Sequence, residues 1–378
     1  MFKWHGGIFF LIFLAIMEKI PLKRIVLKIG TNVLSKENGL LDVTTISHIA
    51  DQIAAAKQRG QQIILVSSGA VGAGRSVHGE SDELNKIVRR QVFAAVGQIR
   101  LMNLYSQFLD NYKILCAQVL ATKEDFRDRR HYLNMRNCFQ ALLRDNILPI
   151  VNENDVVAVD ELMFTDNDEL AGLIASMTGC DGLIILSNVD GVYDGPPDRE
   201  SSQLIPLIEA KDKHFEEYIA PTRSAVGRGG MHTKFRIAQK AASVGIHTII
   251  ANGKRQNILN DIFTGEFIGT HFKAQNAVSP VKKWIAYNEL EKKGQVFIND
   301  GAAQALCSAE RVSSLLPVGI TYIEGDFEKG DIIQIRKADR LIGMGIAQYD
   351  ATQARSFMGQ KEKKALVHYD YLFIEERG

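Results

Sequence analysis

The stretch Arg24-Ile-Val-Leu-Lys28-Ile-Gly30-Thr31 places one lysine inside an apolar run that ends at a glycine. A second apolar run, Gln62–Val66, leads into the glycine-rich segment Ser67-Ser-Gly-Ala-Val-Gly-Ala-Gly74. A strand that opens into such a turn and then a helix forms a ready anion site, because glycines let backbone N–H groups approach the anion and a helix N-terminus favours negative charge. The two segments together suggest phosphoryl transfer, although ordinary strand-to-helix turns of an α/β sheet also account for them.

Strand-like apolar runs alternate with amphipathic segments along most of the chain. The expected strands are Arg24–Ile29, Gln62–Val66, Ile114–Val119, Ile147–Val151, Gly182–Leu186 and His247–Ala251. Segments with apolar residues at three- and four-residue spacing, the expected helices, include Val43–Arg59, Leu84–Asn111, Leu133–Asp145 and Met231–Val244. This alternation predicts an α/β fold, a three-layer αβα sandwich whose mostly parallel sheet is covered on both faces. Ligands of such sheets bind beyond the carboxyl ends of the strands.

The pattern changes near residue 275, where short strand-like runs separated by glycines replace the alternation. These runs include Gly294–Ile298, Gly330–Ile335 and Leu341–Ala347. They predict a small β-rich C-terminal domain. We therefore expect an N-terminal extension over residues 1–21 that is not part of the fold, a core domain over 22–275 and a C-terminal domain over 276–372.

Composition and charge narrow the class of protein. The 378 residues are 46% hydrophobic and 24% charged, with a net charge of +1, which is ordinary for a soluble globular protein. The near-neutral balance argues against an electrostatic binder of nucleic acid or membranes. The four cysteines, Cys116, Cys138, Cys180 and Cys307, lie far apart without CxxC spacing. This usage fits reduced thiols in the cytoplasm better than disulfides or zinc.

An apolar run from Gly7 to Ile16 precedes the first expected strand. It is too short to span a bilayer as a helix, and it lacks the cleavage pattern of a signal peptide, although its length suits the apolar part of one. Met17 follows directly. We expect Met17 to be the natural start of the protein; a membrane tether is the alternative.

Two polar clusters lie beyond expected strand ends. Val151-Asn-Glu-Asn-Asp155 ends one strand, and Phe164-Thr-Asp-Asn-Asp168 opens a helical stretch soon afterwards. Their acidic residues are suited to hold a metal, to orient a lysine or to recognise an ammonium group. Helix capping is the structural alternative, because Asp and Asn are favoured N-caps, but two such clusters at one edge of a sheet favour a site.

Two glycine-containing segments follow further along the chain. Ser187-Asn-Val-Asp-Gly-Val-Tyr193 comes after a strand, and Gly227-Arg-Gly-Gly-Met-His-Thr-Lys234 precedes a helix. Glycines followed by a lysine at a helix start suit phosphate oxygens. The second segment is not a Walker A loop, which requires GxxxxGK[ST] after a strand.

Taken together, these segments closely resemble the amino-acid kinase family, and within it the members that phosphorylate glutamate. The resemblance covers residues 22–372 and is carried by Lys28–Thr31, Ser67–Ala70, Ala94–Gln98, Val151–Asp155, Asp166–Asp168 and Gly229–Lys234. In the tail, Asp300–Ala302 and Ser313–Gly319 resemble the PUA domain that many of these members carry. The combination of kinase core and PUA tail is highly specific.

The resemblance implies a role for each matching residue. The catalytic residues would be Lys28, Asp168 and Lys234, with Asp168 holding the two lysines. Glutamate would contact Ser68, Asp155 and Asn167. ATP would contact Lys28, Ser187, Asn188, Arg228, Gly229, Gly230, Met231, His232, Thr233 and Lys234, and no protein side chain is assigned to a metal. The family often has Gly where Thr165 stands and Thr where Arg228 stands; we expect these two departures to alter affinity without removing a catalytic group.

The resemblance also implies the reaction and its setting. The expected activity is ATP- and Mg²⁺-dependent phosphorylation of the L-glutamate γ-carboxylate to γ-glutamyl phosphate, the first step of proline biosynthesis. Implied partners are proline as a feedback inhibitor, further copies of the chain in a homo-oligomer, and glutamate-5-semialdehyde dehydrogenase, which would receive the product. The expected location is the cytoplasm, without a membrane partner.

Two alternatives compete with this interpretation. One is another member of the family, such as an aspartate, acetylglutamate or uridylate kinase, against which the PUA-like tail and the run Asn152–Asp155 speak. The other is an RNA-binding protein, because PUA domains in other proteins bind RNA. The near-neutral charge and the complete set of lysines and aspartates argue against RNA as the main partner.

Overall fold

The computed structural model describes residues 20, 22–78, 85–157, 166–196, 199, 201–209, 230–275, 282, 285, 293–308 and 313–374. The chain divides into two compact units, residues 1–277 and 278–378. The apolar run Gly7–Ile16 and Met17 lie outside the described residues. Among the helices that the structure does describe, none combines the length and the apolar character needed to cross a membrane.

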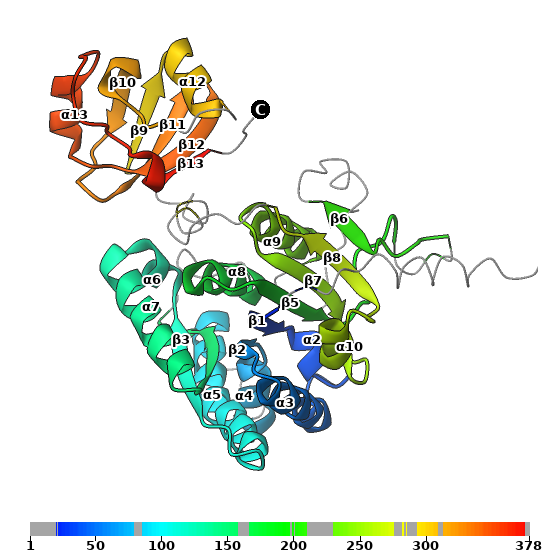
Figure 1. Cartoon of the computed structure of the whole chain (residues 1–378). Coiled ribbons are helices and arrows are strands. Elements are labelled where there is room, and N and C mark those ends of the chain that lie inside the picture. The colour runs from blue at the N-terminus through cyan, green and yellow to red at the C-terminus, as the bar shows by residue number, and fades with distance from the viewer. Residues whose placement is uncertain are drawn as a thin grey trace, which may run out of the picture. The chain divides into compact units, whose positions relative to one another are not determined.

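The first unit alternates strands with helices, as expected for an α/β protein (Figure 1). The strands are β1 (Arg24–Ile29), β2 (Gln62–Ser67), β3 (Cys116–Ala121), β4 (Leu148–Glu153), β5 (Gly182–Ser187), β6 (Leu207–Glu209), β7 (His247–Asn252) and β8 (Gly269–Lys273). The helices are α2 (Thr31–Leu34), α3 (Val43–Gln58), α4 (Ala70–His78), α5 (Lys86–Asp110), α6 (Lys123–Arg127), α7 (Arg129–Arg144), α8 (Asn167–Thr178), α9 (Met231–Ser243) and α10 (Ile258–Thr264). Each expected strand is present, with ends that move by one or two residues.

The strands of the first unit form one mostly parallel sheet in the order β3-β4-β2-β1-β5-β7-β8-β6, which confirms the predicted sheet type. Strand β1 lies between β2 and β5 and pairs in parallel with both. Strand β8 runs antiparallel to β7, and the short β6 pairs in parallel with β8. Strands β6 and β8 were not predicted from the sequence pattern. The carboxyl ends of β1, β2, β4 and β5 therefore meet at one edge of the sheet.

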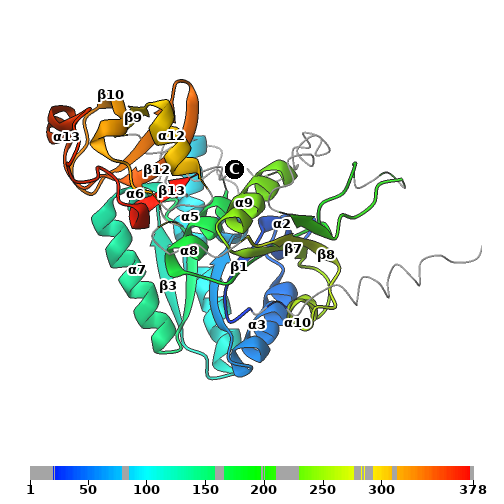
Figure 2. The same ribbon diagram turned by 45° about the horizontal axis from the view of Figure 1, so that its top comes forward.

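Helices cover both faces of the sheet, so the predicted three-layer arrangement is confirmed (Figure 2). Helices α7, α8 and α9 pack against one face, and α2, α3, α5 and α10 lie on the other. Successive side chains of a strand point to opposite faces. In β1, Ile25, Leu27 and Ile29 belong to the core under α3, α5 and α10, so Val26 and Lys28 face the layer that contains α8.

Two glycines let α4 and α5 approach each other closely. A Cβ atom at Gly74 would lie 1.8 Å from the carbonyl oxygen of Phe93, and one at Gly97 would lie 1.8 Å from that of Ala70. Both distances are far shorter than any real contact, so only glycine fits at these positions. The close packing fixes α5 beside the turn that follows β2.

The second unit is built mainly of strands, as expected for the C-terminal domain. Its elements are β9 (Gly294–Ile298), α12 (Asp300–Cys307), β10 (Ile320–Gly325), β11 (Ile332–Lys337), β12 (Arg340–Ile346), α13 (Ala351–Phe357) and β13 (Leu372–Ile374). The strands form a sheet in the order β10-β9-β11-β12-β13, with β9 and β11 parallel and the other pairs antiparallel. Its apolar core, which includes Val296, Ile333 and Leu366, contains residues of this unit alone.

The separate apolar cores generate a prediction about truncation. The main core of the first unit uses residues between Leu22 and Phe267, and that of the second uses residues between Val296 and Ile374. We therefore expect a chain that ends at Gln275 to fold cooperatively on its own. Circular dichroism and thermal denaturation of this fragment, with the full chain as control, measure this. A fragment that is soluble but lacks a cooperative transition would contradict the prediction.

Candidate active site

Lys28 lies near the carboxyl end of β1, the central strand of the sheet. Its side chain is only 4% exposed. A buried ammonium group is costly unless an opposite charge neutralises it. The neutralising group is the carboxylate of Asp168, whose Oδ1 lies 2.5 Å from Lys28 Nζ.

Asp168 lies in the first turn of α8, which packs against β1. The side chain is fully buried, and the positive end of the helix dipole favours a carboxylate at this position. Its second oxygen, Oδ2, accepts a hydrogen bond of 2.8 Å from Lys234 Nζ. One carboxylate therefore holds two ammonium groups from separate elements.

Lys234 comes from the first turn of α9, whose N-cap is Gly230. Gly230 has no side chain that could cap the helix. Among the described residues, no side chain caps the N-terminus of α9, and its N–H groups would suit an anion beside the lysine pair. The structure thus brings together Lys28, Asp168 and Lys234, the three residues that the sequence analysis named as catalytic.

The charges of this triad follow from its geometry. Burial alone would raise the pKa of Asp168, but the ammonium groups of Lys28 and Lys234 lower it well below the usual range. Burial opposes charge on Lys234 as well, yet the neighbouring Asp168 raises its pKa. With all three groups ionised, the triad carries one net positive charge, which suits a phosphoryl oxygen.

Asp166 is the N-cap of α8, and its Oδ1 accepts hydrogen bonds from the backbone N–H groups of Asp168 and Glu169. Its Oδ2 is buried without a hydrogen-bond partner among the described residues. Burial, followed by the charge of Asp168, raises the pKa of Asp166 to about 7. The sequence analysis placed Asp166 in a motif but gave it no role.

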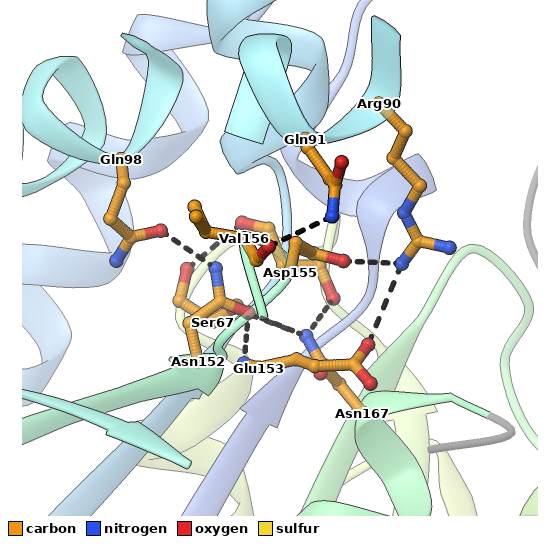
Figure 3. A network of polar contacts seen from close by, with 10 residues as sticks. Ser67, Arg90, Gln91, Gln98, Asn152, Glu153, Asp155, Val156 and Asn167 are labelled. Carbon is orange, nitrogen blue, oxygen red and sulfur yellow. Dashed lines mark hydrogen bonds and ion pairs between the residues drawn. The ribbon is translucent and has the colours of Figure 1, made fainter. Parts of the chain in front are cut away.

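A hydrogen-bond network surrounds Asn167, the residue between the two aspartates (Figure 3). Asn167 Nδ2 lies 3.0 Å from Ser68 Oγ and 3.1 Å from Asn152 Oδ1. Asn152 Nδ2 in turn donates to Gln98 Oε1 on α5 at 3.0 Å. This network joins the ends of β2 and β4 to the start of α8 and brings together two of the residues assigned to glutamate, Ser68 and Asn167.

Asp155, the third residue assigned to glutamate, follows β4 and pairs with Arg90 of α5. Arg90 Nη2 lies 2.5 Å from Asp155 Oδ1 and 3.5 Å from Glu153 Oε2 (Figure 3). Burial raises the pKa of Asp155, and Arg90 opposes that rise. The sequence analysis missed Arg90, because neither its neighbours nor its spacing distinguishes it from an ordinary helix residue.

Ser187 and Asn188, assigned to ATP, lie at the carboxyl end of β5, next to β1. In the part of the chain that the structure describes, neither side chain forms a hydrogen bond with Lys28 or Lys234. Beside them, Asp190 accepts hydrogen bonds from Arg255 and Asn252, both of which follow or end β7. These bonds join the loops after β5 and β7 at the same edge of the sheet.

The structure describes some, but not all, of the other residues that were singled out near the ATP site. Gly230, Met231 and Thr233 lie at or near the N-terminus of α9, and the side chain of His232 is exposed. Arg228, Gly229 and Thr165 lie outside the described residues. Among the described side chains, no group of three or more His, Cys, Asp or Glu residues could hold a metal ion by itself.

The α/β fold, with Lys28, Lys234 and their shared carboxylate gathered near the carboxyl end of β1, is the arrangement expected of a phosphotransferase. The profile of the amino acid kinase family matches residues 23–252, and that of the PUA domain matches residues 294–369. The chain belongs to the amino acid kinase family.

Individual members of this family are similar to the chain over almost its whole length. The chain is 52% identical to the glutamate 5-kinase of Chlorobaculum tepidum, over 93% of this chain and 97% of that protein. It is 51% identical to the glutamate 5-kinase of Bacteroides thetaiotaomicron, over 93% and 98%. Among solved structures, carbamate kinase from Giardia lamblia bound to AMP-PNP matches with a TM-score of 0.52 at 19% identity, over 68% of this chain and 100% of that one, which shows a shared fold.

The raised pKa of Asp166 generates a prediction about stability. Between the unfolded value near 3.9 and the folded value of about 7, the folded protein binds a proton that the unfolded chain releases. Stability therefore falls as the pH rises through this range. Asp166→Asn keeps the capping oxygen but cannot titrate, so its melting temperature relative to wild type should increase from pH 5 to pH 8.

The measurement is thermal denaturation of ligand-free protein across that pH range. Asp190→Asn is the control, because hydrogen bonds from Arg255 lower the pKa of Asp190 and leave it ionised throughout. The difference in melting temperature between Asp190→Asn and wild type should stay constant from pH 5 to pH 8. If the difference in melting temperature between Asp166→Asn and wild type does not change with pH, the raised pKa of Asp166 is contradicted.

Proposed function

We propose that this protein transfers the γ-phosphoryl group of ATP to the γ-carboxylate of L-glutamate, which yields γ-glutamyl phosphate for proline biosynthesis. The observation that carries the proposal is the pairing of Lys28 and Lys234 with one buried carboxylate, Asp168. Two fixed cations at the end of a parallel sheet suit the negative charge of a transferring phosphoryl group. The names of the relatives at 52% and 51% identity support glutamate as the acceptor.

The acceptor needs no general base. A γ-carboxylate has a reference pKa near 4.3, so it is already ionised at neutral pH. One of its oxygens forms the new bond to the γ-phosphorus, while the bond from that phosphorus to the β–γ bridging oxygen breaks and ADP leaves. Catalysis then depends on positioning and on neutralising the phosphoryl oxygens. Lys28 and Lys234 would supply the charge, and Asp168 would hold both lysines in place.

The two sides of the triad would bind the two substrates. Ser68 and Asn167 lie in the hydrogen-bond network of β2, β4 and α8, where they would contact glutamate. Asp155 would bind the ammonium group of glutamate. The N-terminus of α9 from Gly230 to Lys234, which no described side chain caps, would bind the phosphates of ATP. The loop at Ser187-Asn188 would contact the nucleotide.

The described residues also fit Mg²⁺. This ion is usually bound by one or two carboxylates, waters and substrate phosphates rather than by a complete protein cage. Asp166 Oδ2 is a buried oxygen without a partner among the described residues, so Asp166 would hold the ion. Bound there with ATP, Mg²⁺ would supply positive charge to the phosphate oxygens.

Further proposals rest on the family resemblance. We propose that the protein acts in the cytoplasm as a homo-oligomer and that proline inhibits it. The product is an acyl phosphate, which is reactive toward water. We therefore propose that glutamate-5-semialdehyde dehydrogenase receives it directly.

A coupled assay of ADP release tests the proposed function. We expect release to require both ATP and glutamate, and to fall by about 10²–10³ in Lys28→Ala and Lys234→Ala, by analogy with the loss of one charge-stabilising donor. Circular dichroism of each variant checks the fold. ADP release that is independent of glutamate, or normal turnover in a folded lysine variant, would contradict the proposal.

Asp155 and Asp168 should affect different kinetic constants. Asp155→Ala removes a contact to bound glutamate, so we expect its KM for glutamate to rise by about 10- to 100-fold with little change in kcat. Asp168→Ala releases the two lysines, so kcat should fall by orders of magnitude. Steady-state kinetics of both variants measure this, with Asp168→Asn as a control of similar shape. The reverse pattern would mean that the two roles are exchanged.

A further inference from the structure

Arg90 extends from the N-terminal part of α5 toward the polar residues at the end of β4 (Figure 3). Its guanidinium contacts Asp155 and Glu153, whose side chains are 8% and 7% exposed, whereas Arg90 itself is 26% exposed. The cation therefore lies on the accessible side of the two carboxylates. A molecule that reaches Asp155 also reaches Arg90.

The position of Arg90 is fixed by its helix. The neighbouring Gln91 donates a hydrogen bond of 2.8 Å from Nε2 to the carbonyl oxygen of Val156, which holds α5 against the segment after β4. Further along α5, Gln98 contacts Asn152. The close packing of α4 on α5 at Gly74 and Gly97 adds a third constraint. Arg90 is thus presented to the site by a rigid element.

The guanidinium uses only part of its bonding capacity. Both contacts to Asp155 and Glu153 come from Nη2. In the described parts of the chain, Nε and Nη1 have no protein partner. An arginine offers five N–H donors in a planar fork that matches a carboxylate. Arg90 can therefore bind a second carboxylate without releasing Asp155.

Asp155 likewise has an oxygen that, among the described residues, is free to accept a further hydrogen bond. Its Oδ1 bonds to Arg90, and its Oδ2 has no partner among the described residues. A carboxylate and a guanidinium that touch each other present a negative and a positive group side by side. An α-amino acid carries an ammonium and a carboxylate on one carbon atom, so its head group has the matching pair of charges.

We propose that Arg90 binds the α-carboxylate of the amino-acid substrate while Asp155 binds its ammonium group. The pair of residues would then recognise the zwitterionic head group, and the γ-carboxylate would extend toward Lys28 and Lys234. This assignment rests on the proposed function, because it makes Arg90 a specificity-determining residue for the acceptor. The competing role, in which Arg90 only holds Asp155 in place, predicts a different response to the substrate's α-carboxylate.

The test compares L-glutamate with L-isoglutamine, in which the α-carboxylate is an uncharged amide while the ammonium and γ-carboxylate are kept. Both compounds are assayed as substrates and, by competition, as ligands of the wild type and of Arg90→Gln. We expect the wild type to prefer glutamate by about 10- to 100-fold, the usual range for a hydrogen-bonded charge pair. This preference should fall to within about threefold in Arg90→Gln, because the amide and the carboxylate then meet an uncharged side chain.

A matched control is Arg89→Gln, which removes the same charge from the adjacent position of α5 and should keep the full preference. A preference that is unchanged in Arg90→Gln, or absent from the wild type, would overturn the proposal. If Arg90→Gln loses activity and affinity equally for glutamate and isoglutamine, Arg90 only positions Asp155. If Arg90→Gln does not fold, Arg90→Lys is measured in the same way, and its preference must fall because lysine lacks the planar fork.

The two proposals can fail separately. ADP release by the wild type with glutamate tests the proposed function, and it does not depend on Arg90. The change in preference between glutamate and isoglutamine tests Arg90 alone, because a loss of turnover that is common to both compounds cancels in the ratio.

Discussion

The site depends on one fully buried carboxylate, Asp168, which neutralises two lysine ammonium groups. Removing charges from water is expensive, and loss of one partner of a buried pair leaves the others uncompensated. Lys28 on β1 and Lys234 on α9 can lie this close together only while the carboxylate separates their like charges. The interaction therefore joins the central strand to two helices of one layer, and it leaves the triad with a net positive charge.

The parallel sheet explains why distant parts of the chain meet at this point. In the register of β1 with its neighbours, Ile29 lies opposite Ser67 of β2 and Leu186 of β5. The residues that follow these strands therefore project from one edge. The turn at Gly69 adopts a positive φ of 104°, which suits glycine, and it turns the chain from β2 into α4.

The two sides of the site are built from different chemistry. At one side, the start of α9 has a glycine as its N-cap and carries Lys234. On the opposite side, side-chain amides and a hydroxyl link α5 through β4 to α8, and the Arg90–Asp155 pair joins α5 to the segment after β4. Fixed donors of this kind suit a reaction that needs positioning rather than proton transfer.

The sequence alone determined the fold class and much of the chemistry. The alternation of apolar runs with amphipathic segments predicted the parallel sheet, because these patterns depend on local geometry. The segments around Lys28 and Ser67–Gly74 suggested phosphoryl transfer, and the family resemblance assigned catalytic roles to Lys28, Asp168 and Lys234. The strands β6 and β8 escaped detection because they are short and pair at the far edge of the sheet. Only the tertiary structure placed Arg90 against Asp155 and left Asp166 with a buried, unpartnered oxygen among the described residues. These properties arise from contacts between residues more than sixty positions apart or from burial, and neither leaves a periodic signal in the chain.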